Sequence, residues 1–194
     1  MEGKKKIGLF FGSFNPIHIG HLIIANFFVE NSNLNEVWFI ISPQNPFKNK
    51  ESLLDDRQRF YMVQLAVEDN SKFKASNIEF HLEKPSYTIF TLAVLAEKYP
   101  NFDFVLLVGS DNLENFGKWK NYEDILSNHQ IFVYRRPGSK NSEFDEHANV
   151  KFFDAPLMQI SSSYIRKQIK AKRSVEYLLP PKVFDYISEM HLYI

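Results

Sequence analysis

The sequence has no cysteine among its 194 residues. Disulfide bonds, thiolate catalysis and cysteine-ligated zinc sites are therefore excluded, and the composition suits a reducing compartment. No apolar run approaches the ~20 residues that a helix needs to span a bilayer. Turn residues follow Phe11, where a signal peptide would continue its apolar core. We therefore expect a cytoplasmic protein that neither crosses nor binds a membrane.

The sequence also lacks an excess of charge of either sign. Lysine and arginine together number 23, as do aspartate and glutamate, so the formal net charge is zero. Because proteins that bind nucleic acid are usually basic, we do not expect a nucleic-acid partner. The composition leaves open whether the chain forms a homo-oligomer. With 19 phenylalanines, the chain is long enough for one domain with a phenylalanine-rich core.

Residues 6–22 combine an apolar strand, a turn and the start of an apolar helix. Residues 7–11 favour a buried strand, and Gly12 allows the backbone to approach a ligand closely. His18 and His21 are three residues apart at the expected helix start, so their side chains face the same way. Helix starts attract anions, and two imidazoles can donate hydrogen bonds to phosphate oxygens. The pattern therefore predicts a nucleotide-phosphate site.

Two other interpretations of this stretch stay open at this point. A strand followed by a turn and a helix occurs in many α/β proteins, where a histidine near the helix start is often a capping or surface residue. The two histidines could also bind zinc. That site would need a further ligand from a distant part of the chain, because the sequence has no cysteine.

Buried-type strands alternate with amphipathic helices along the rest of the chain. The patterns predict strands at residues 36–41, 74–82, 102–108, 130–135 and 150–154, and helices at residues 54–69, 88–99, 122–126 and 161–169, with a last helix entered at Pro181. This alternation argues for an α/β fold with a doubly wound, mostly parallel sheet. We expect a single domain over residues 1–194 with a small helical portion from about residue 155.

Polar residues gather where the expected strands end and the expected helices begin. Parallel strands place their carboxyl ends at one edge of a sheet, so these residues can share one site. They lie at residues 12–21, 43–48, 109–111, 135–136 and 161–166. Lys48 is a candidate phosphate contact, and Arg166 follows three serines at a helix start, where its planar fork could hold a phosphate. Each also fits an ordinary solvated side chain.

Three further features have two interpretations each. Asp111 could accept hydrogen bonds from ribose hydroxyls or cap a helix. Trp119 could stack on a flat heteroaromatic ring or cover the core. Residues 139–149 are polar and are the best candidate for a mobile loop.

Two stretches resemble signatures of the nucleotidyltransferase superfamily. Residues 12–21, GSFNPIHIGH, resemble its GxFxPxHxGH signature, and residues 160–166, ISSSYIR, resemble its C-terminal ISSTxIR signature. Further blocks at residues 84–92, 109–113, 119 and 177–183 resemble those of bacterial nicotinate-nucleotide adenylyltransferases. The resemblance covers nearly the whole chain and implies the Rossmann-like nucleotidyltransferase fold.

The resemblance also implies a reaction. ATP would transfer its adenylyl group to nicotinate mononucleotide, which gives deamido-NAD and pyrophosphate in NAD biosynthesis. By analogy, a phosphate oxygen of the mononucleotide attacks the α-phosphorus of ATP in line, so the enzyme works by positioning the substrates and neutralising charge. Mg²⁺ would be held mainly by substrate phosphates and water rather than by protein ligands.

Roles for individual residues follow from the same resemblance. The catalytic residues would be His18, His21, Arg166 and Lys48, with His21 nearest the transition state. The ATP-binding residues would be Gly12, Ser13, Phe14, His18, His21, Gly109, Asp111, Ser162, Ser163 and Arg166. The nicotinate-nucleotide-binding residues would be Tyr87, Thr88, Trp119 and Lys48, with Trp119 stacked on the pyridine ring and backbone N–H groups near Thr88 facing the carboxylate.

The chain departs from the family pattern at a few positions. Asn15 stands where Asp is frequent, and Ser163 stands where Thr is frequent. Phe90 stands at the position where the Ser-Tyr-Thr-Ile block often continues with Asp. Phe90 bears on the nicotinate pocket. Nicotinamide mononucleotide is the nearest alternative substrate, and phosphopantetheine adenylyltransferases share the first signature without the further blocks. A nucleotide sensor without catalysis is a remote alternative, which the intact histidines and arginine of the two signatures oppose.

Overall fold

The computed structural model describes residues 3–43, 53–136, 138–156 and 158–194. Its six-stranded sheet has the order β3-β2-β1-β4-β5-β6, with β1 (Lys5–Gly12) in the interior. The other strands are β2 (Glu36–Ile41), β3 (Phe73–Ser76), β4 (Phe102–Gly109), β5 (Ile131–Tyr134) and β6 (Val150–Phe153). Every neighbouring pair is parallel, which confirms the predicted doubly wound parallel sheet. The strand order reverses between β1 and β4, where open α/β sheets bind ligands.

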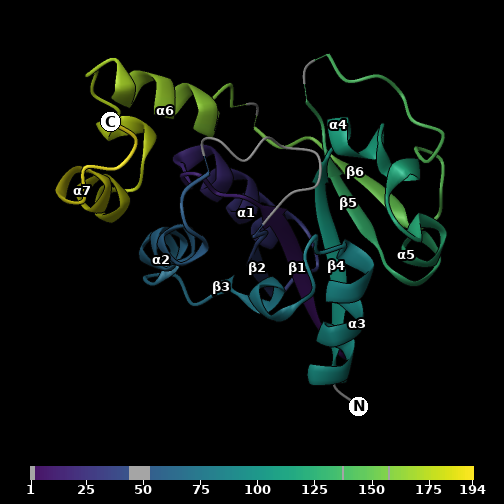
Figure 1. Cartoon of the computed structure of the whole chain (residues 1–194). Helices are drawn as coiled ribbons and strands as arrows, with labels where there is room; N and C mark the ends of the chain where they lie inside the picture. Colours follow the sequence, from purple (N-terminus) through teal and green to yellow (C-terminus); the bar gives the residue numbers. More distant parts are fainter. Residues whose placement is uncertain (1–2, 44–52, 137, 157) are drawn as a thin grey trace.

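Helices cover both faces of this sheet (Figure 1). One face packs against α1 (Ile19–Asn31), α2 (Asp56–Val67), α6 (Ser162–Lys170) and α7 (Pro181–Glu189). The other face packs against α3 (Thr88–Lys98), α4 (Ser110–Leu113) and α5 (Tyr122–Asn128). Successive residues of a strand point to opposite faces, so Leu9 and Phe10 of β1 enter different cores.

Phenylalanine contributes to both cores, as predicted. Phe28, Phe39 and Phe132 are at most 1% exposed, and their rings contact further aromatic rings at centroid distances near 6 Å. Residues 155–194 hold α6, the 3₁₀ turn η3 (Glu176–Leu178) and α7. Ile165 and Val183 from this portion lie in the same core cluster as Phe39 of the sheet.

The prediction of a strand over residues 74–82 is partly wrong. β3 ends at Ser76, and residues Ile78–His81 form a 3₁₀ turn, η1. The alternation of apolar residues there suggested a strand, but Glu79 between them is 2% exposed and accepts hydrogen bonds from Ser86 and Thr91. Burying this carboxylate requires the chain to turn at Asn77 rather than to extend the sheet edge.

Residues 139–149 lack regular helix and strand, as expected for a loop. Phe144 from this segment is nevertheless buried in the second core cluster, with its ring edge-to-face on Phe116 at 5.4 Å. The packed ring anchors the middle of the segment.

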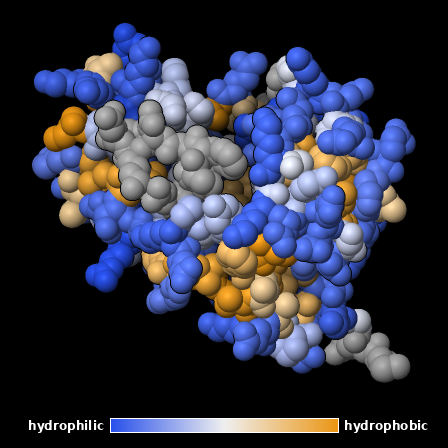
Figure 2. Space-filling view, turned by 45° about the vertical axis from the view of Figure 1, so that its right-hand side comes forward, coloured by the Kyte–Doolittle hydropathy of each residue, from blue (hydrophilic) through white to orange (hydrophobic). Residues whose placement is uncertain are grey.

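The surface is mostly hydrophilic in the space-filling view, and apolar side chains reach it in smaller groups (Figure 2). None of the described helices is both long and apolar enough to cross a membrane.

Candidate functional site

A cavity of about 340 Å³ lies at the carboxyl ends of the central strands. Its lining includes Gly12 at the end of β1, Gly109 at the end of β4 and Tyr134 at the end of β5. Seven of the residues expected to bind the two nucleotides line it, namely Gly12, His21, Tyr87, Thr88, Gly109, Asp111 and Trp119. The parallel sheet therefore gathers residues from most of the chain around one space.

The two histidines of the first signature lie side by side at the start of α1. Their rings stack with centroids 3.7 Å apart and planes 29° apart, which confirms that the side chains face the same way. The backbone N–H of His18 donates to His21 Nδ1 over 3.2 Å. A neutral imidazole that accepts at Nδ1 carries its proton on Nε2, so His21 has an N–H group for donation at its far nitrogen.

His18 is 5% exposed. Burial and, to a smaller extent, the positive charge of Arg136 lower the pKa of His18 to about 4, so its ring is neutral near pH 7. Its Nδ1 atom is buried without a hydrogen-bond partner in the described part of the chain. Buried polar atoms are normally paired, so this ring is suited to a polar ligand. The zinc interpretation lacks further ligands, since the described residues contain no group of three His, Cys, Asp or Glu placed to hold a metal ion.

The turn before α1 is shaped by Phe14. This residue has a φ of 44° and a side chain that is 2% exposed in the core, so its backbone alone is left for a ligand. A Cβ atom on Gly12 would lie 2.8 Å from the Phe14 ring. Gly12 is therefore needed for this packing as well as for close approach by a ligand.

The second signature packs directly against the first. The Ser162 hydroxyl donates to the carbonyl of Pro16 over 2.8 Å, and Arg166 Nη1 donates to the carbonyl of Asn15 over 2.7 Å. Arg166 Nη2 also donates to Ser163 Oγ over 3.3 Å. The start of α6 is thus joined to residues 15 and 16 across about 150 positions of sequence.

The structure divides the expected ATP-binding residues into two groups. Gly12, His21, Gly109 and Asp111 line the cavity. The others are not among its described lining residues and lie in the adjoining turn before α1 or at the start of α6; they are Ser13, Phe14, His18, Ser162, Ser163 and Arg166. Lys48, expected to contact both nucleotides, lies outside the described residues.

Arg136 is a site residue that the sequence left unassigned beyond its place after a strand. Its guanidinium donates to Tyr134 Oη over 2.7 Å and to Asp111 Oδ2 over 3.2 Å, and it lines the cavity. A Cβ atom on Gly109 would lie 2.4 Å from Asp111 Oδ1 and 2.9 Å from Arg136 Nε. Glycine at 109 therefore permits this ion pair at the cavity wall. The positive charge of Arg136 also helps to lower the pKa of His18.

Glu79 is a second residue that sequence reasoning missed, because it falls in the stretch taken for a strand. It lines the cavity from η1, and burial raises the pKa of its carboxyl while bonds from Thr91, Ser86 and Ser42 oppose the rise. The Thr91 hydroxyl donates over 2.7 Å and the Ser86 hydroxyl over 2.9 Å. Glu79 thereby ties the segment before α3 to α3 itself.

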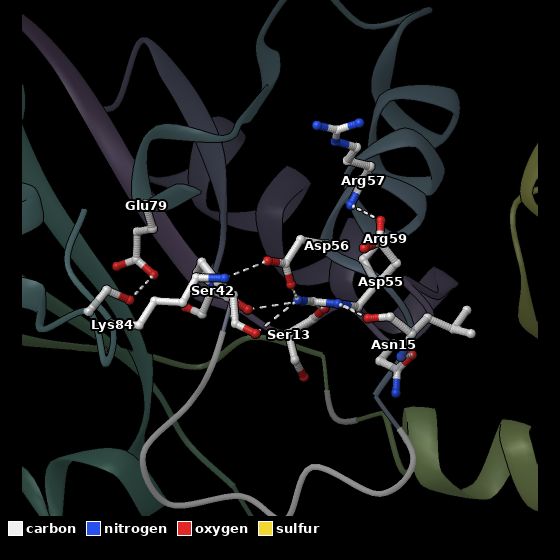
Figure 3. Close-up of polar contacts among 12 residues, drawn as sticks. Ser13, Asn15, Ser42, Asp55, Asp56, Arg57, Arg59, Glu79 and Lys84 are labelled. Carbon is white, nitrogen blue, oxygen red and sulfur yellow. Dashed lines mark hydrogen bonds and ion pairs between the residues drawn. The ribbon is translucent and has the colours of Figure 1, made fainter. Parts of the chain in front are cut away.

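Arg59 is a third missed residue, and it holds the strand ends beside the site (Figure 3). Its side chain is fully buried in α2. Its guanidinium donates to the carbonyls of Ser13, Ser42 and Pro43 over 2.6, 2.9 and 3.2 Å, and it pairs with Asp56. The sequence placed Arg59 on the polar start of a helix, and nothing local marked it as buried.

Aromatic side chains form part of the cavity wall. Trp119 is partly buried against Phe116, with ring centroids 5.3 Å apart, and still lines the cavity. It therefore covers the core and also borders the cavity, while its stacking on a heteroaromatic ring stays a prediction. Tyr87 and Thr88 face the same space from the start of α3.

Comparisons with known proteins agree with this fold and indicate the family. A cytidylyltransferase-like family model matches residues 9–168. A probable nicotinate-nucleotide adenylyltransferase of Flavobacterium psychrophilum is 52% identical over 190 residues, which cover 97% of this chain and 98% of that protein. One with the same description from Bacteroides thetaiotaomicron is 45% identical and covers 97% and 93%.

A solved structure shares the fold. The Plasmodium falciparum nicotinic acid mononucleotide adenylyltransferase in complex with NaAD superposes with a TM-score of 0.82 and 23% identity, covering 97% of each chain. The family match and the high identity to relatives along nearly the whole sequence decide the assignment. The chain belongs to the cytidylyltransferase-like family and, within it, to the nicotinate-nucleotide adenylyltransferases.

Proposed function

We propose that this chain transfers the adenylyl group of ATP to nicotinate mononucleotide and releases pyrophosphate. The observation that carries the proposal is the direct contact between the two signature stretches. Ser162 and Arg166 from the second bond to the carbonyls of Pro16 and Asn15 in the first, beside a cavity at the reversal of strand order. Such an edge, with a helix start and basic side chains, suits the phosphates of a nucleotide.

The reaction requires that the two substrates be held in position, and it needs no covalent nucleophile from the protein. A phosphate oxygen of the mononucleotide attacks the α-phosphorus of ATP in line, the bond from that phosphorus to the bridging oxygen breaks, and pyrophosphate leaves. We assign His21 Nε2–H to the oxygen that gains charge and His18 to the ATP phosphates. Ser162, Ser163 and Arg166 would hold the outer phosphates, with Lys48 assisting. Donors placed where charge develops stabilise the transition state.

The remaining residues would bind the two nucleosides. Gly12, Ser13 and Phe14 would offer backbone near the α-phosphate, and Gly109 and Asp111 would lie by the adenosine ribose. We extend this list to Arg136, which pairs with Asp111 at the cavity wall. Tyr87, Thr88 and Trp119 would enclose the pyridine ring.

Mg²⁺ belongs to this proposal as an ion held by the substrates. It commonly keeps several waters and binds substrate phosphates through few protein ligands. Asp111, the acidic residue at the proposed ATP end, is paired with Arg136, and the described residues offer no three-ligand cage. This donor set fits an ion that arrives with ATP, where it would neutralise phosphate charge.

A substrate panel tests the proposal. The purified chain is given ATP and Mg²⁺ with nicotinate mononucleotide, nicotinamide mononucleotide or phosphopantetheine, and pyrophosphate release is measured. We expect the highest kcat/KM with nicotinate mononucleotide. A higher kcat/KM with either other acceptor would show that this other compound, and not nicotinate mononucleotide, is the substrate. ATP binding without pyrophosphate release for any acceptor would indicate a nucleotide sensor.

Replacing Trp119 by alanine should raise KM for the mononucleotide and leave KM for ATP unchanged. Stacking of a base on an aromatic side chain contributes ~1–3 kcal/mol, which corresponds to roughly 5- to 150-fold in KM. Steady-state kinetics with each substrate varied in turn measures the effect. Trp119→Phe is the matched control, because it keeps a stacking face. A rise in KM for ATP alone would move Trp119 to the adenosine end.

A further inference from the structure

Three lysine and arginine side chains are among the described lining residues of the cavity, and they differ in the groups that they contact. Arg136 forms an ion pair with Asp111, and Lys118 donates to the amide oxygen of Asn115 over 2.8 Å. Lys120 Nζ instead lies over two aromatic rings, 4.7 Å from the centroid of Tyr87 and 4.6 Å from that of Phe90. Within the described ranges, no carboxylate pairs with Lys120.

The two rings hold the ammonium group in place without cancelling its charge. Tyr87 and Phe90 meet edge-to-face with centroids 6.0 Å apart, one turn apart at the start of α3. The face of an aromatic ring attracts a cation through its quadrupole, which carries no net charge. Lys120 therefore presents a positioned positive charge to the cavity.

This charge lies at the end of the cavity that we assign to the pyridine ring. Lys120 follows Trp119 in sequence, and its ammonium covers Tyr87, so it adjoins both proposed ring-binding side chains. The described lining also holds Lys118, which precedes Trp119 in sequence, and Glu79, whose carboxylate would repel a substrate carboxylate. Hydrogen bonds from Ser86 and Thr91 disperse that negative charge. A nearby cation is then the group that favours an acid over its amide.

We propose that Lys120, held over Tyr87 and Phe90, is a specificity-determining residue that recognises the ring carboxylate of nicotinate mononucleotide. The inference rests on the proposed function. The acid and the amide share the ribose, the phosphate and the ring, and they differ in one negative charge. A cation placed near the ring substituent stabilises the bound acid and does little for the amide.

Lys120→Met tests this role, because methionine keeps most of the aliphatic length over the rings and removes the charge. We expect the ratio of kcat/KM for the acid to that for the amide to fall roughly 5- to 10-fold, the range for losing one partly exposed charged contact. The loss should lie in KM for the acid, with KM for ATP unchanged. Calorimetric binding of each mononucleotide gives a readout that does not need turnover.

Lys120→Glu is a second variant that reverses the charge at the same position. It should lower the ratio further than Lys120→Met does, because the new carboxylate repels the acid and not the amide. Phe90→Leu removes one of the two rings and keeps the charge of Lys120, so it should lower the ratio less than either. Lys74→Met is the matched control: Lys74 Nζ lies 4.3 Å from the Trp38 ring away from the cavity lining, so its removal should leave the ratio unchanged.

The outcomes separate this inference from the proposed function. An equal loss for acid and amide would overturn it, because Lys120 would then contact the phosphate that both share. An unchanged ratio in Lys120→Met would overturn it as well. Failure of the unmodified chain to bind or adenylylate either mononucleotide would overturn the proposed function, and the inference with it.

Discussion

His21→Ala should lower kcat by roughly 10²–10³-fold, the cost of removing one hydrogen-bond donor to a transition state. The geometry gives the reason. His21 Nδ1 accepts from the His18 backbone N–H over 3.2 Å, so the proton of the neutral ring is on Nε2, and the side chain lines the cavity. We expect a modest change in KM for ATP, because the donor acts on charge that develops in the reaction. Pyrophosphate release under saturating substrates measures kcat.

Two further variants distinguish catalysis from the structural role of His21 at the helix start. His21→Asn offers an oxygen to the His18 N–H but has no donor at the far position, so it should lose as much kcat as alanine does. His21→Gln offers an amide N–H further out and should recover part of the loss. A kcat unaltered in His21→Ala would refute the assigned role. Recovery by asparagine would show that the helix cap matters instead.

Arg59→Leu should lower the free energy of unfolding by about 3–5 kcal/mol, because several backbone carbonyls lose a charged donor at about 1–3 kcal/mol each. The fully buried guanidinium supplies donors to the carbonyls of Ser13, Ser42 and Pro43 (Figure 3). Leucine fills much of the volume but leaves these carbonyls without their donor, while Asp56 keeps its ion pair with Lys84. Each buried acceptor left without a partner adds its own desolvation cost.

Urea unfolding measures this loss, with the slope of the transition compared between variants. Arg57→Leu is the control: it lies in the same helix but its side chain is exposed, and a surface change should stay within about 0.5 kcal/mol. Arg59→Lys should fall between the two, because one ammonium cannot reach all the carbonyls that the planar fork bonds. Equal stability of Arg59→Leu and Arg57→Leu would contradict the structural role of Arg59.

Local patterns predicted most of the elements because their cause is local. The run at residues 36–41 coincides with β2, since a continuous apolar stretch is buried in a parallel sheet whichever strands flank it. The helix stop before Pro100 and the entry at Pro181 are also local effects. The strand prediction at residues 74–82 was partly wrong because the cause of the structure there is not local. The shape of this stretch depends on hydroxyls of Ser86 and Thr91 that bond Glu79.

The same distinction applies to the site. The two signatures are short contiguous stretches, so the sequence by itself determined them, the stacked pair His18 and His21, and the family. Only the tertiary structure decided that Arg59 and Glu79 belong beside them, and that Asp111 pairs with Arg136. One partner of each lies far away in sequence: Ser13 is 46 positions from Arg59, Thr91 is 12 from Glu79 and Asp111 is 25 from Arg136. Whether a charged side chain is solvated or buried depends on groups that folding brings to it, and no local pattern records those groups.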